Sequence, residues 1–531
     1  MADTEKSFHA ESAKAKKEAK PKKGGLNWIA LVITVLVGVI LWFVPMPAGL
    51  ETFAADVVGD GGAFNTLITK AGMSDAEAAH YVAVNCWHLF AIFVATIVGL
   101  ISKPLPMGAV SIIALTVIML TGILDDGKTS TSFITNTLSG FHNTTIWLIV
   151  IAFFISRGFI KTGLGNRIAY LFMSKFGKRT LGLSYSLAVT DLVLATAMPS
   201  NTARAGGVIY PIVQSLSRVF GSRPDDGTGR KIGAYLHVTA FQADMITSSM
   251  FMTAMAANPL AVSLAASAAG INIDWAGWAI AACVPGLVCL IVVPWVIFKI
   301  FPPEIKETPE AADLAHAKLQ EMGPVKTSEK LMIAVFIIIL VLWIAGSSIG
   351  LNATVTGFIG LSLLLLLGVL NWDDIKSEKG AWDTLVWFAA LVMMATYLNT
   401  MGLIPWFSDL MAGVVSGMPW LVALIILGVI YFISHYLFAS ATAHVSAMYS
   451  AFLMVCLAAG APPLASAMLL GCFSNLMGCL THYGSGPGPV FFGSGYVSQG
   501  KWWTIGLICG IITMLIFFTV GFGWWGIIGY M

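Results

Sequence analysis

Two short polar stretches carry side chains that can bind a small anion. The first is Ser200-Asn201-Thr202 and the second is Ser440-Ala441-Thr442, and each lies between two apolar runs. Hydroxyl and amide groups donate hydrogen bonds to carboxylates, and the N-terminus of a helix attracts negative charge. Because the pattern returns in the second half of the chain, we predict one substrate-binding site with two facing halves, made by Ser200, Asn201, Thr202, Ser440, Ala441 and Thr442.

A basic residue follows each polar stretch at the same spacing. Arg204 lies four residues after Ser200, and His444 lies four residues after Ser440. A charged group inside a membrane is costly and usually has a function. We therefore predict that Arg204 and His444 balance the charge of an anionic substrate. The alternatives are an Arg204 side chain that extends to water and a His444 that is a neutral, hydrogen-bonded core residue.

Two acids, Asp191 and Asp244, are also expected at membrane depth. The simpler interpretation is that either acid neutralises Arg204, and the alternative is a cation or proton site. Three other histidines are interpreted as polar packing or cavity-lining groups, with the last of them the best ligand candidate: His237, His435 and His482.

Two long apolar segments, 233–269 and 464–497, contain polar breaks rich in Ser, Asn, Gly or Pro. Backbone groups that lose their helical partners are tolerated at membrane depth only when they are buried in protein or line a wet cavity. Such a break can bind ions or substrate, although it can also be a kink that relieves packing. The further substrate-binding candidates in these breaks are Ser248, Ser249, Ser474, Asn475, Thr481 and His482.

The elements that must position these residues are membrane helices. The chain is 57% hydrophobic and 11% charged, whereas a soluble protein carries about 25% charged residues. Apolar runs of transmembrane length recur. We predict an all-α polytopic membrane protein with about 11 transmembrane helices and two re-entrant hairpins, at 181–217 and 421–459. The spans are expected near 27–47, 85–102, 107–124, 145–158, 233–269, 278–298, 331–347, 353–371, 384–400, 464–497 and 503–529.

The distribution of Lys and Arg fixes the expected orientation. With the N-terminus in the cytoplasm, all but three of the 29 Lys and Arg residues fall on the cytoplasmic side or in its loops. The exceptions are Lys70 and Lys128 outside, and Arg204 within the membrane. This segregation requires both hairpins to be re-entrant and places the C-terminus outside.

The chain then divides into two halves of opposite orientation. Inverted repeats with broken helices near the midplane are typical of secondary transporters. The expected parts are a basic cytoplasmic tail (1–26), a first span with an outside loop (27–84), a first repeat (85–298), a cytoplasmic linker (299–330) and a second repeat (331–529). The seven cysteines lie in apolar stretches and are interpreted as buried small residues, so no metal or cofactor is expected.

Three motifs resemble those of the divalent anion/sodium symporter (DASS) family. They are Pro199–Gly207, Ser440–His444 and Ser474–Pro489, the last followed by Phe491–Tyr496. The first and third are similar to those of a branch that holds plastid 2-oxoglutarate/malate translocators and bacterial citrate/succinate and tartrate/succinate antiporters. The chain departs from the family's sodium symporters at Ala441, where they carry an Asn, so one amide is missing.

The resemblance implies a homodimer in the bacterial inner membrane, with a scaffold and an elevator-like transport domain that carries both hairpins. The implied substrates are di- or tricarboxylates, namely 2-oxoglutarate, malate, succinate, tartrate or citrate, with no nucleic-acid partner. Because Arg204 and His444 are expected where a symporter would bind sodium, we predict sodium-independent exchange of anions.

Several alternatives remain beside exchange. Sodium-coupled symport would place Na⁺ near Ser200, Asn201, Ser440 and Thr442 and would make Arg204 structural. An intramembrane enzyme is another alternative, but the chain contains no H-E-x-x-H motif and no acid pair at helical spacing. A haem-bearing redox subunit would need histidine pairs on facing helices, and the chain has no convincing pair. An ion channel is also possible, but inverted hairpins favour a carrier. A carrier that is not an enzyme is therefore the predicted function.

Overall fold

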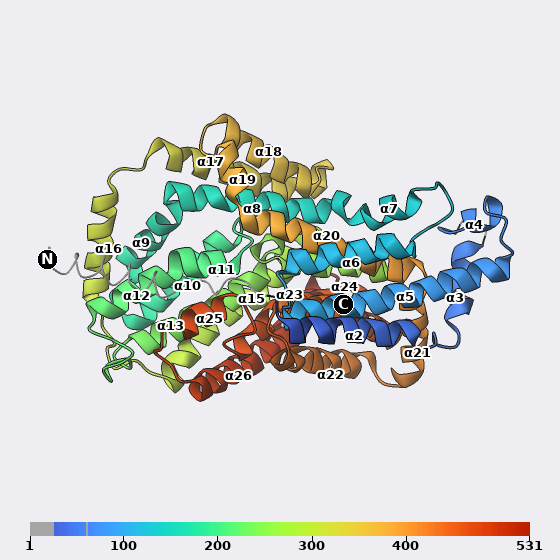
Figure 1. The fold of residues 1–531 in the computed structure, drawn as a ribbon. Helices are drawn as coiled ribbons and strands as arrows, with labels where there is room; N and C mark the ends of the chain where they lie inside the picture. The colour runs from blue at the N-terminus through green and yellow to red at the C-terminus, as the bar shows by residue number, and fades with distance from the viewer. Residues whose placement is uncertain (1–25, 60–61, 416) are drawn as a thin grey trace.

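The computed structural model describes residues 26–59, 62–415 and 417–531, and these residues form helices joined by short connections (Figure 1). Within them, β-pairing is limited to an isolated bridge between Arg179 and Glu307. The expected basic tail, 1–26, lies outside the described residues except for Leu26. The fold is that of an all-helical polytopic membrane protein.

In the part of the chain that the structure describes, nine helices are long and apolar enough to cross a membrane. Shorter apolar helices account for several of the other expected spans. Large apolar side chains are exposed along α2 (Trp28–Phe43), α6 (Met107–Thr121) and α17 (Thr327–Ala345). Such long apolar faces suit contact with lipid rather than water.

One group of helices, here called the wall, packs together on one side of the site. Within the wall, α2 lies against α5, α5 against α6, α6 against α20, and α8 against α18. Its members are α2, α5 (Asp75–Ser102), α6, α8 (Thr144–Thr162), α17, α18 (Ala353–Leu366) and α20 (Lys379–Thr400).

A second group, here called the hairpin bundle, holds the breaks and polar tips. All 18 residues of α13 (Gly233–Met250) are buried, and so is most of α24 (Pro463–Leu476), because other helices of the bundle surround them. The remaining main members are α10 (Thr180–Ala195), α14 (Ala257–Ala269), α15 (Trp275–Ile300), α22 (Trp420–Ile433), α23 (Ala441–Ala458) and α26 (Gln499–Ile516).

The two segments expected as hairpins each hold two helical arms around a short extended tip. In the first, α10 is followed by α11 (Asn201–Arg204), a π-helical turn over Ala205–Ile209 and α12 (Tyr210–Val219). In the second, α22 passes through a 3-10 turn at Ser434–Leu437 and extended residues into α23. In Figure 1, α10 and α12 lie on the left and α22 lies on the right, so the arms approach the centre from opposite ends.

The two segments expected as broken spans are interrupted near the middle of the molecule. The first has extended backbone at Phe251 and Met255 between α13 and α14. The second leaves helical geometry after a 3-10 turn at Met477–Leu480 and resumes as α25 (Pro487–Phe492). The second break is rich in Gly and Pro, which do not sustain a regular helix.

The segment at 51–84, expected as an outside connection between spans, contains helices. It contains α3 (Leu50–Val58), α4 (Thr66–Thr69) and the first turns of α5, which begins at Asp75 rather than near residue 85. Ser74 caps α5 in a capping box with Glu77, a start signal that the sequence contained.

The expected linker, 299–330, also contains a helix. This helix, α16 (Pro309–Met322), packs on α9 (Leu164–Phe176). The linker is tied to α9 and α17 by Arg167, which pairs with Glu329 at 2.8 Å and donates to the carbonyl of Gly323. The remaining short helices are α7 (Ser132–Thr137), α19 (Trp372–Ser377), α21 (Leu403–Val415) and α27 (Phe522–Ile527).

Candidate functional site

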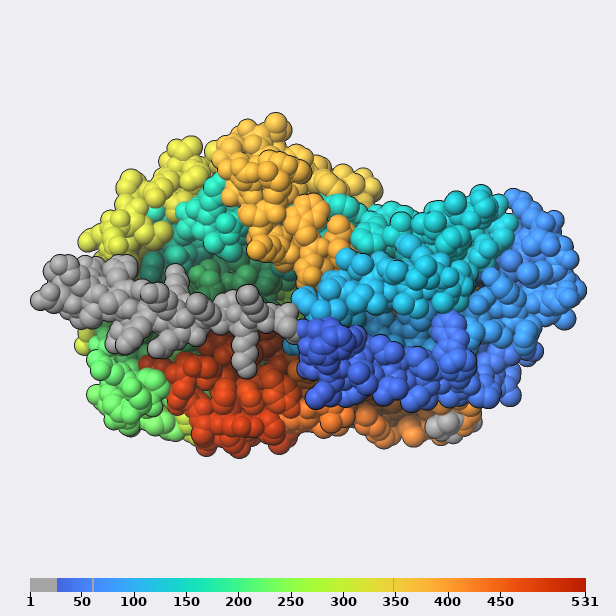
Figure 2. Space-filling model, in the orientation of Figure 1, coloured from blue at the N-terminus to red at the C-terminus, as the bar shows by residue number. Residues whose placement is uncertain are grey.

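The tips of both hairpins and both helix breaks meet around one cavity of about 400 Å³. Figure 2 shows a recess in one face of the molecule, below the orange segments that precede α20 and with green segments at its floor. The hairpin bundle supplies most of the cavity lining, and the wall supplies Lys103 and Phe153. The bundle residues are Pro199, Ser200, Asn201, Thr202, Met255, Ala256, Ala439, Ser440, Ala441, Thr442, Tyr483, Ser485, Gly486 and Pro489.

The two tips have the same local geometry. Ser200 is the N-cap of α11, and its hydroxyl accepts a hydrogen bond from the backbone N–H of Ala203 at 3.1 Å. Ser440 is the N-cap of α23, and its hydroxyl accepts from the N–H of Ala443 at 3.4 Å. Both caps leave helix N-termini beside the cavity, and the partial positive charge there favours an anion.

Two buried polar groups in the cavity lining have no partner among the described residues. The Oδ1 atom of Asn201 accepts from the N–H of Thr202 at 2.8 Å, but its Nδ2 donor is unpaired. The hydroxyl of Ser485 is also unpaired. Both residues are 5% exposed, so leaving these groups unpaired costs free energy that a bound anion can recover.

The second break lies directly against the first tip. A Cβ atom added to Gly486 would stand 1.9 Å from the Oγ1 of Thr202, so only a glycine fits this approach. Beside it, the Tyr483 hydroxyl donates to the backbone carbonyl of Tyr436 at 2.8 Å. The contact between Gly486 and Thr202 joins the two halves of the chain at the cavity, and the Tyr483 bond holds the second break to the second hairpin.

Arg204 is fully buried behind the first tip and does not line the cavity. Its Nη1 atom donates to the backbone carbonyls of Met198, at 2.7 Å, and Ala254, at 2.6 Å. Both carbonyls belong to segments where a helix is interrupted. Freed carbonyls of this kind coordinate cations in transporters, and here a guanidinium takes that position.

Two carboxylates accompany the guanidinium. The Nε atom of Arg204 lies 3.2 Å from Asp191, and its Nη2 atom lies 3.3 Å from Asp244. Ser248 completes the set, accepting from Nη2 at 2.8 Å, and Thr247 donates to the second oxygen of Asp191. The predicted neutralisation of Arg204 by an acid therefore agrees with this geometry, which uses both acids.

His444 occupies the equivalent position behind the second tip, in different surroundings. Its Nε2 atom lies 2.9 Å from the hydroxyl of Ser434, and its Nδ1 atom is buried without a partner. The rings of Tyr431 and Phe438 lie 4.5 Å from the imidazole, centroid to centroid. In the described residues no carboxylate pairs with His444, so its charge-balancing role stays a prediction.

The other predicted ligands lie outside the cavity lining and bond to protein groups. In the first half, Ser248 bonds to Arg204, and Ser249 donates to the carbonyl of Ile246. In the second half, Ser474 bonds to Tyr431 and Asn475 donates to Asn258, which links the two broken helices. Thr481 accepts from the N–H of Gly484, and His482 accepts from the indole of Trp503. These six residues therefore support the site from within the hairpin bundle and do not line its cavity.

Among the polar side chains of the lining, sequence reasoning missed Lys103, Tyr483 and Ser485 as ligand candidates. Ser485 belongs to the predicted break, but it has no counterpart in the first half to mark it. Lys103 lies in the connection after α5, where a lysine is expected from the charge rule alone. A signal for Ser485 was available in the Gly-Ser-Gly-Pro-Gly-Pro run over 484–489, where backbone and side chain can both approach a ligand.

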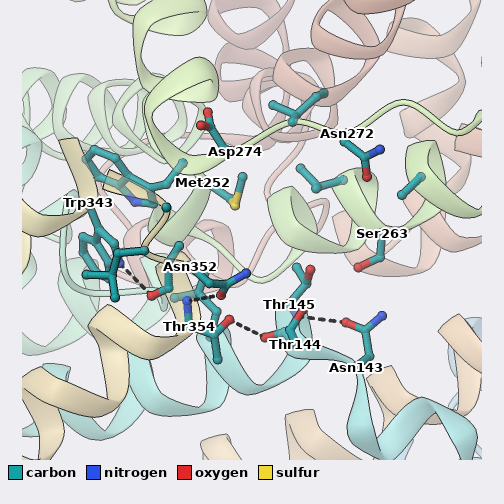
Figure 3. Close-up of a pocket in the computed structure, with 18 of the residues that line it drawn as sticks. Asn143, Thr144, Thr145, Met252, Ser263, Asn272, Asp274, Trp343, Asn352 and Thr354 are labelled. Carbon is teal, nitrogen blue, oxygen red and sulfur yellow. Dashed lines mark hydrogen bonds between the residues drawn. The ribbon is translucent and has the colours of Figure 1, made fainter. Parts of the chain in front are cut away.

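A larger cavity, of about 810 Å³, lies between the wall and the hairpin bundle (Figure 3). The wall contributes Thr144 and Thr354, which are joined by a 2.8 Å hydrogen bond from the Thr354 hydroxyl to the Thr144 carbonyl. The bundle contributes Met252 and Asp274, and the Asp274 carboxylate caps α15 by accepting from the N–H of Gly277 (Figure 3). Neither tip reaches this cavity, and Asp274 is the charged side chain in its lining, which disfavours an anion.

Comparison with known proteins agrees with the fold. Residues 76–531 match the family model described as the sodium:sulfate symporter transmembrane region. A Bacillus subtilis protein, YflS, whose name describes it as a candidate malate transporter, is 57% identical over 96% of this chain and 98% of its own length. Dicarboxylate transporter 1 of spinach chloroplasts is 46% identical, over 94% of this chain and 81% of its own.

A third relative is named as an antiporter. The L-tartrate/succinate antiporter of Shigella sonnei is 34% identical over 94% of this chain and 99% of its own length. Among solved structures, MtrF of Neisseria gonorrhoeae has the same fold, with a TM-score of 0.54 and 14% identity over 81% of this chain and 97% of its own. The protein is therefore a multi-pass membrane transporter rather than an enzyme, and it belongs to the divalent anion/sodium symporter family, the family of the sodium:sulfate symporter model.

Proposed function

We propose that this protein carries dicarboxylates across the membrane and exchanges one for another without sodium. The observation that carries the proposal is the position of Arg204. Its guanidinium lies between the carbonyls of Met198 and Ala254, at the place behind the tip where a mobile cation would otherwise bind.

The chemistry of the cavity supports a carboxylate substrate. The cavity offers an unpaired amide donor from Asn201, an unpaired hydroxyl from Ser485 and two helix N-termini at the tips. Its lining contains no carboxylate among the described residues. The names of relatives as dicarboxylate transporters and as a tartrate/succinate antiporter point to the same substrate class.

The coupling mode follows from fixed rather than mobile charge. A guanidinium that is held by five hydrogen bonds cannot leave with the substrate or be replaced by sodium. Because the guanidinium already fills the position behind the tip, no mobile cation is bound there to accompany the substrate, and exchange for a second anion is the coupling that we propose. His444 fills the equivalent position in the second half, so neither position is left open for a free cation.

Movement of the hairpin bundle against the wall would expose the site to each side in turn. Both cavities lie on the seam between these two groups, one at the tips and one between α8, α14 and α18. In the proposed topology the N-terminus and Lys103 are cytoplasmic.

Counterflow into proteoliposomes tests the proposal. Vesicles loaded with unlabelled succinate should take up labelled succinate in the complete absence of sodium, and empty vesicles should not. Replacing choline with sodium outside should leave the rate unchanged. Uptake into empty vesicles that requires an inward sodium gradient would establish symport instead.

A further inference from the structure

We infer that Lys103, a residue of the wall, binds one carboxylate of the substrate and sets the preference for doubly charged anions. This inference rests on the proposed function and adds a ligand from outside the hairpin bundle. Among the described residues that line the tip cavity, Lys103 is the one with a charged side chain. It therefore provides the positive charge that a second carboxylate requires.

The charge of Lys103 is not used within the protein. In the described part of the chain it forms no ion pair, and its side chain is exposed to the cavity side of the wall. Arg204, by contrast, is buried between Asp191 and Asp244. A free ammonium beside a cavity without carboxylates attracts anions and favours two charges over one.

The backbone at Lys103 has a conformation that costs a lysine free energy. Its φ is 53° and its ψ is 54°, the left-handed conformation, and it is the one non-glycine residue with positive φ among the described residues. The position ends α5, where glycine is the usual residue. The neighbouring backbone is held by a 3.2 Å bond from Asn27 N–H to the Pro104 carbonyl. The chain thus presents an ammonium from a fixed point of the wall.

The second tip lacks an amide donor, so the second carboxylate of the substrate needs a ligand from elsewhere. Ala441 stands where the first tip has Asn201, so the second tip offers no amide donor to a carboxylate. A dicarboxylate that binds Asn201 with one end is left with a second carboxylate to satisfy. Lys103 lines the same cavity, and its long, flexible side chain can reach the second carboxylate of the substrate.

Two substitutions remove the charge of Lys103 without straining the backbone, because both new residues adopt the left-handed conformation readily. Lys103→Gly and Lys103→Asn remove the ammonium at a position where Gly and Asn are well tolerated. Both variants should have an unchanged or higher melting temperature, whereas the KM for succinate exchange should rise about fivefold. Lys103→Arg should keep the wild-type KM, and Lys70→Asn, which removes an exposed lysine that does not line the tip cavity, is the matched control.

Monomethyl succinate, which carries one carboxylate, distinguishes the role of the second charge. Its inhibition constant should be the same for the wild type and for Lys103→Asn, while that of succinate rises. An unchanged KM for succinate in both Lys103→Gly and Lys103→Asn overturns the inference and leaves the proposed function intact. An equal rise for succinate and monomethyl succinate also overturns it. A wild-type protein that exchanges no dicarboxylate overturns the proposed function itself.

Discussion

Gly486 and Thr202 meet where the two halves of the chain close around the cavity. A Cβ atom on Gly486 would lie 1.9 Å from the Oγ1 atom of Thr202 and 3.2 Å from its Cβ atom. The first tip and the second break are therefore in direct contact, although they are far apart in the sequence. Any change in this contact moves Asn201 and Ser485, the two neighbours that carry unpaired polar groups.

Gly486→Ala should abolish exchange, because the added methyl group collides with Thr202 and separates the tip from the break. The double variant Thr202→Ala/Gly486→Ala removes the closest contact and leaves the 3.2 Å one, so it should recover part of the exchange rate. Gly500→Ala, where nothing lies within 4 Å, is the control and should behave as wild type. Normal counterflow by Gly486→Ala would show that the two elements separate freely.

Asn201→Ala and Ser485→Ala should each weaken substrate binding by removing a donor that faces the cavity. A neutral hydrogen bond contributes about 0.5–1.5 kcal/mol, so the KM should rise by roughly two- to tenfold in each case. Asn201→Asp keeps the size of the side chain but places a negative charge beside the substrate, and should be worse than Asn201→Ala. The measurement is the concentration dependence of succinate counterflow. A wild-type KM in both alanine variants would remove these residues from the binding site.

The sequence predicts those parts of the site whose motif occurs in both halves of the chain. Ser200 and Ser440 could be paired in advance because the same pattern with the same basic spacing occurs twice, and the structure places both tips at one cavity. The two hairpins and two breaks were recognisable because polar, Gly- and Pro-rich residues interrupt apolar runs. The start of α5 was missed because its first turns are too polar to be distinguished from a loop by hydropathy.

The directions of side chains inside buried helices were not predictable. Every residue of α13 is buried, so no hydrophobic face reveals that Ser248 points to Arg204 rather than to the cavity. The same holds for Ser474 in α24. Lys103 could not be assigned because it has no repeated counterpart, and only the packing of the wall brings it to the tips.

Arg204→Ala should prevent stable folding, because it leaves Asp191 and Asp244 buried without their positive partner. Breaking a buried ion pair in this way costs about 3–5 kcal/mol. The triple variant Arg204→Met/Asp191→Asn/Asp244→Asn is neutral and should restore a monodisperse protein with a cooperative melting transition. It should not restore sodium-free exchange, since the fixed cation is absent. Exchange at the wild-type rate by the triple variant would show that Arg204 serves only to pair the acids.

Ser267 and Thr396 face each other across the seam between the hairpin bundle and the wall, with their hydroxyl oxygens 3.0 Å apart. If α14 moves past α20 during transport, a covalent link at this point should stop it. The double variant Ser267→Cys/Thr396→Cys should lose exchange after oxidation and recover it after reduction, because the separation suits a disulfide. Thr34→Cys/Ser102→Cys, whose native oxygens lie 3.4 Å apart within the wall, is the matched control and should exchange normally when oxidised. Undiminished counterflow by the cross-linked Ser267→Cys/Thr396→Cys protein, verified by its shifted gel mobility, would mean that the substrate crosses without movement along this seam.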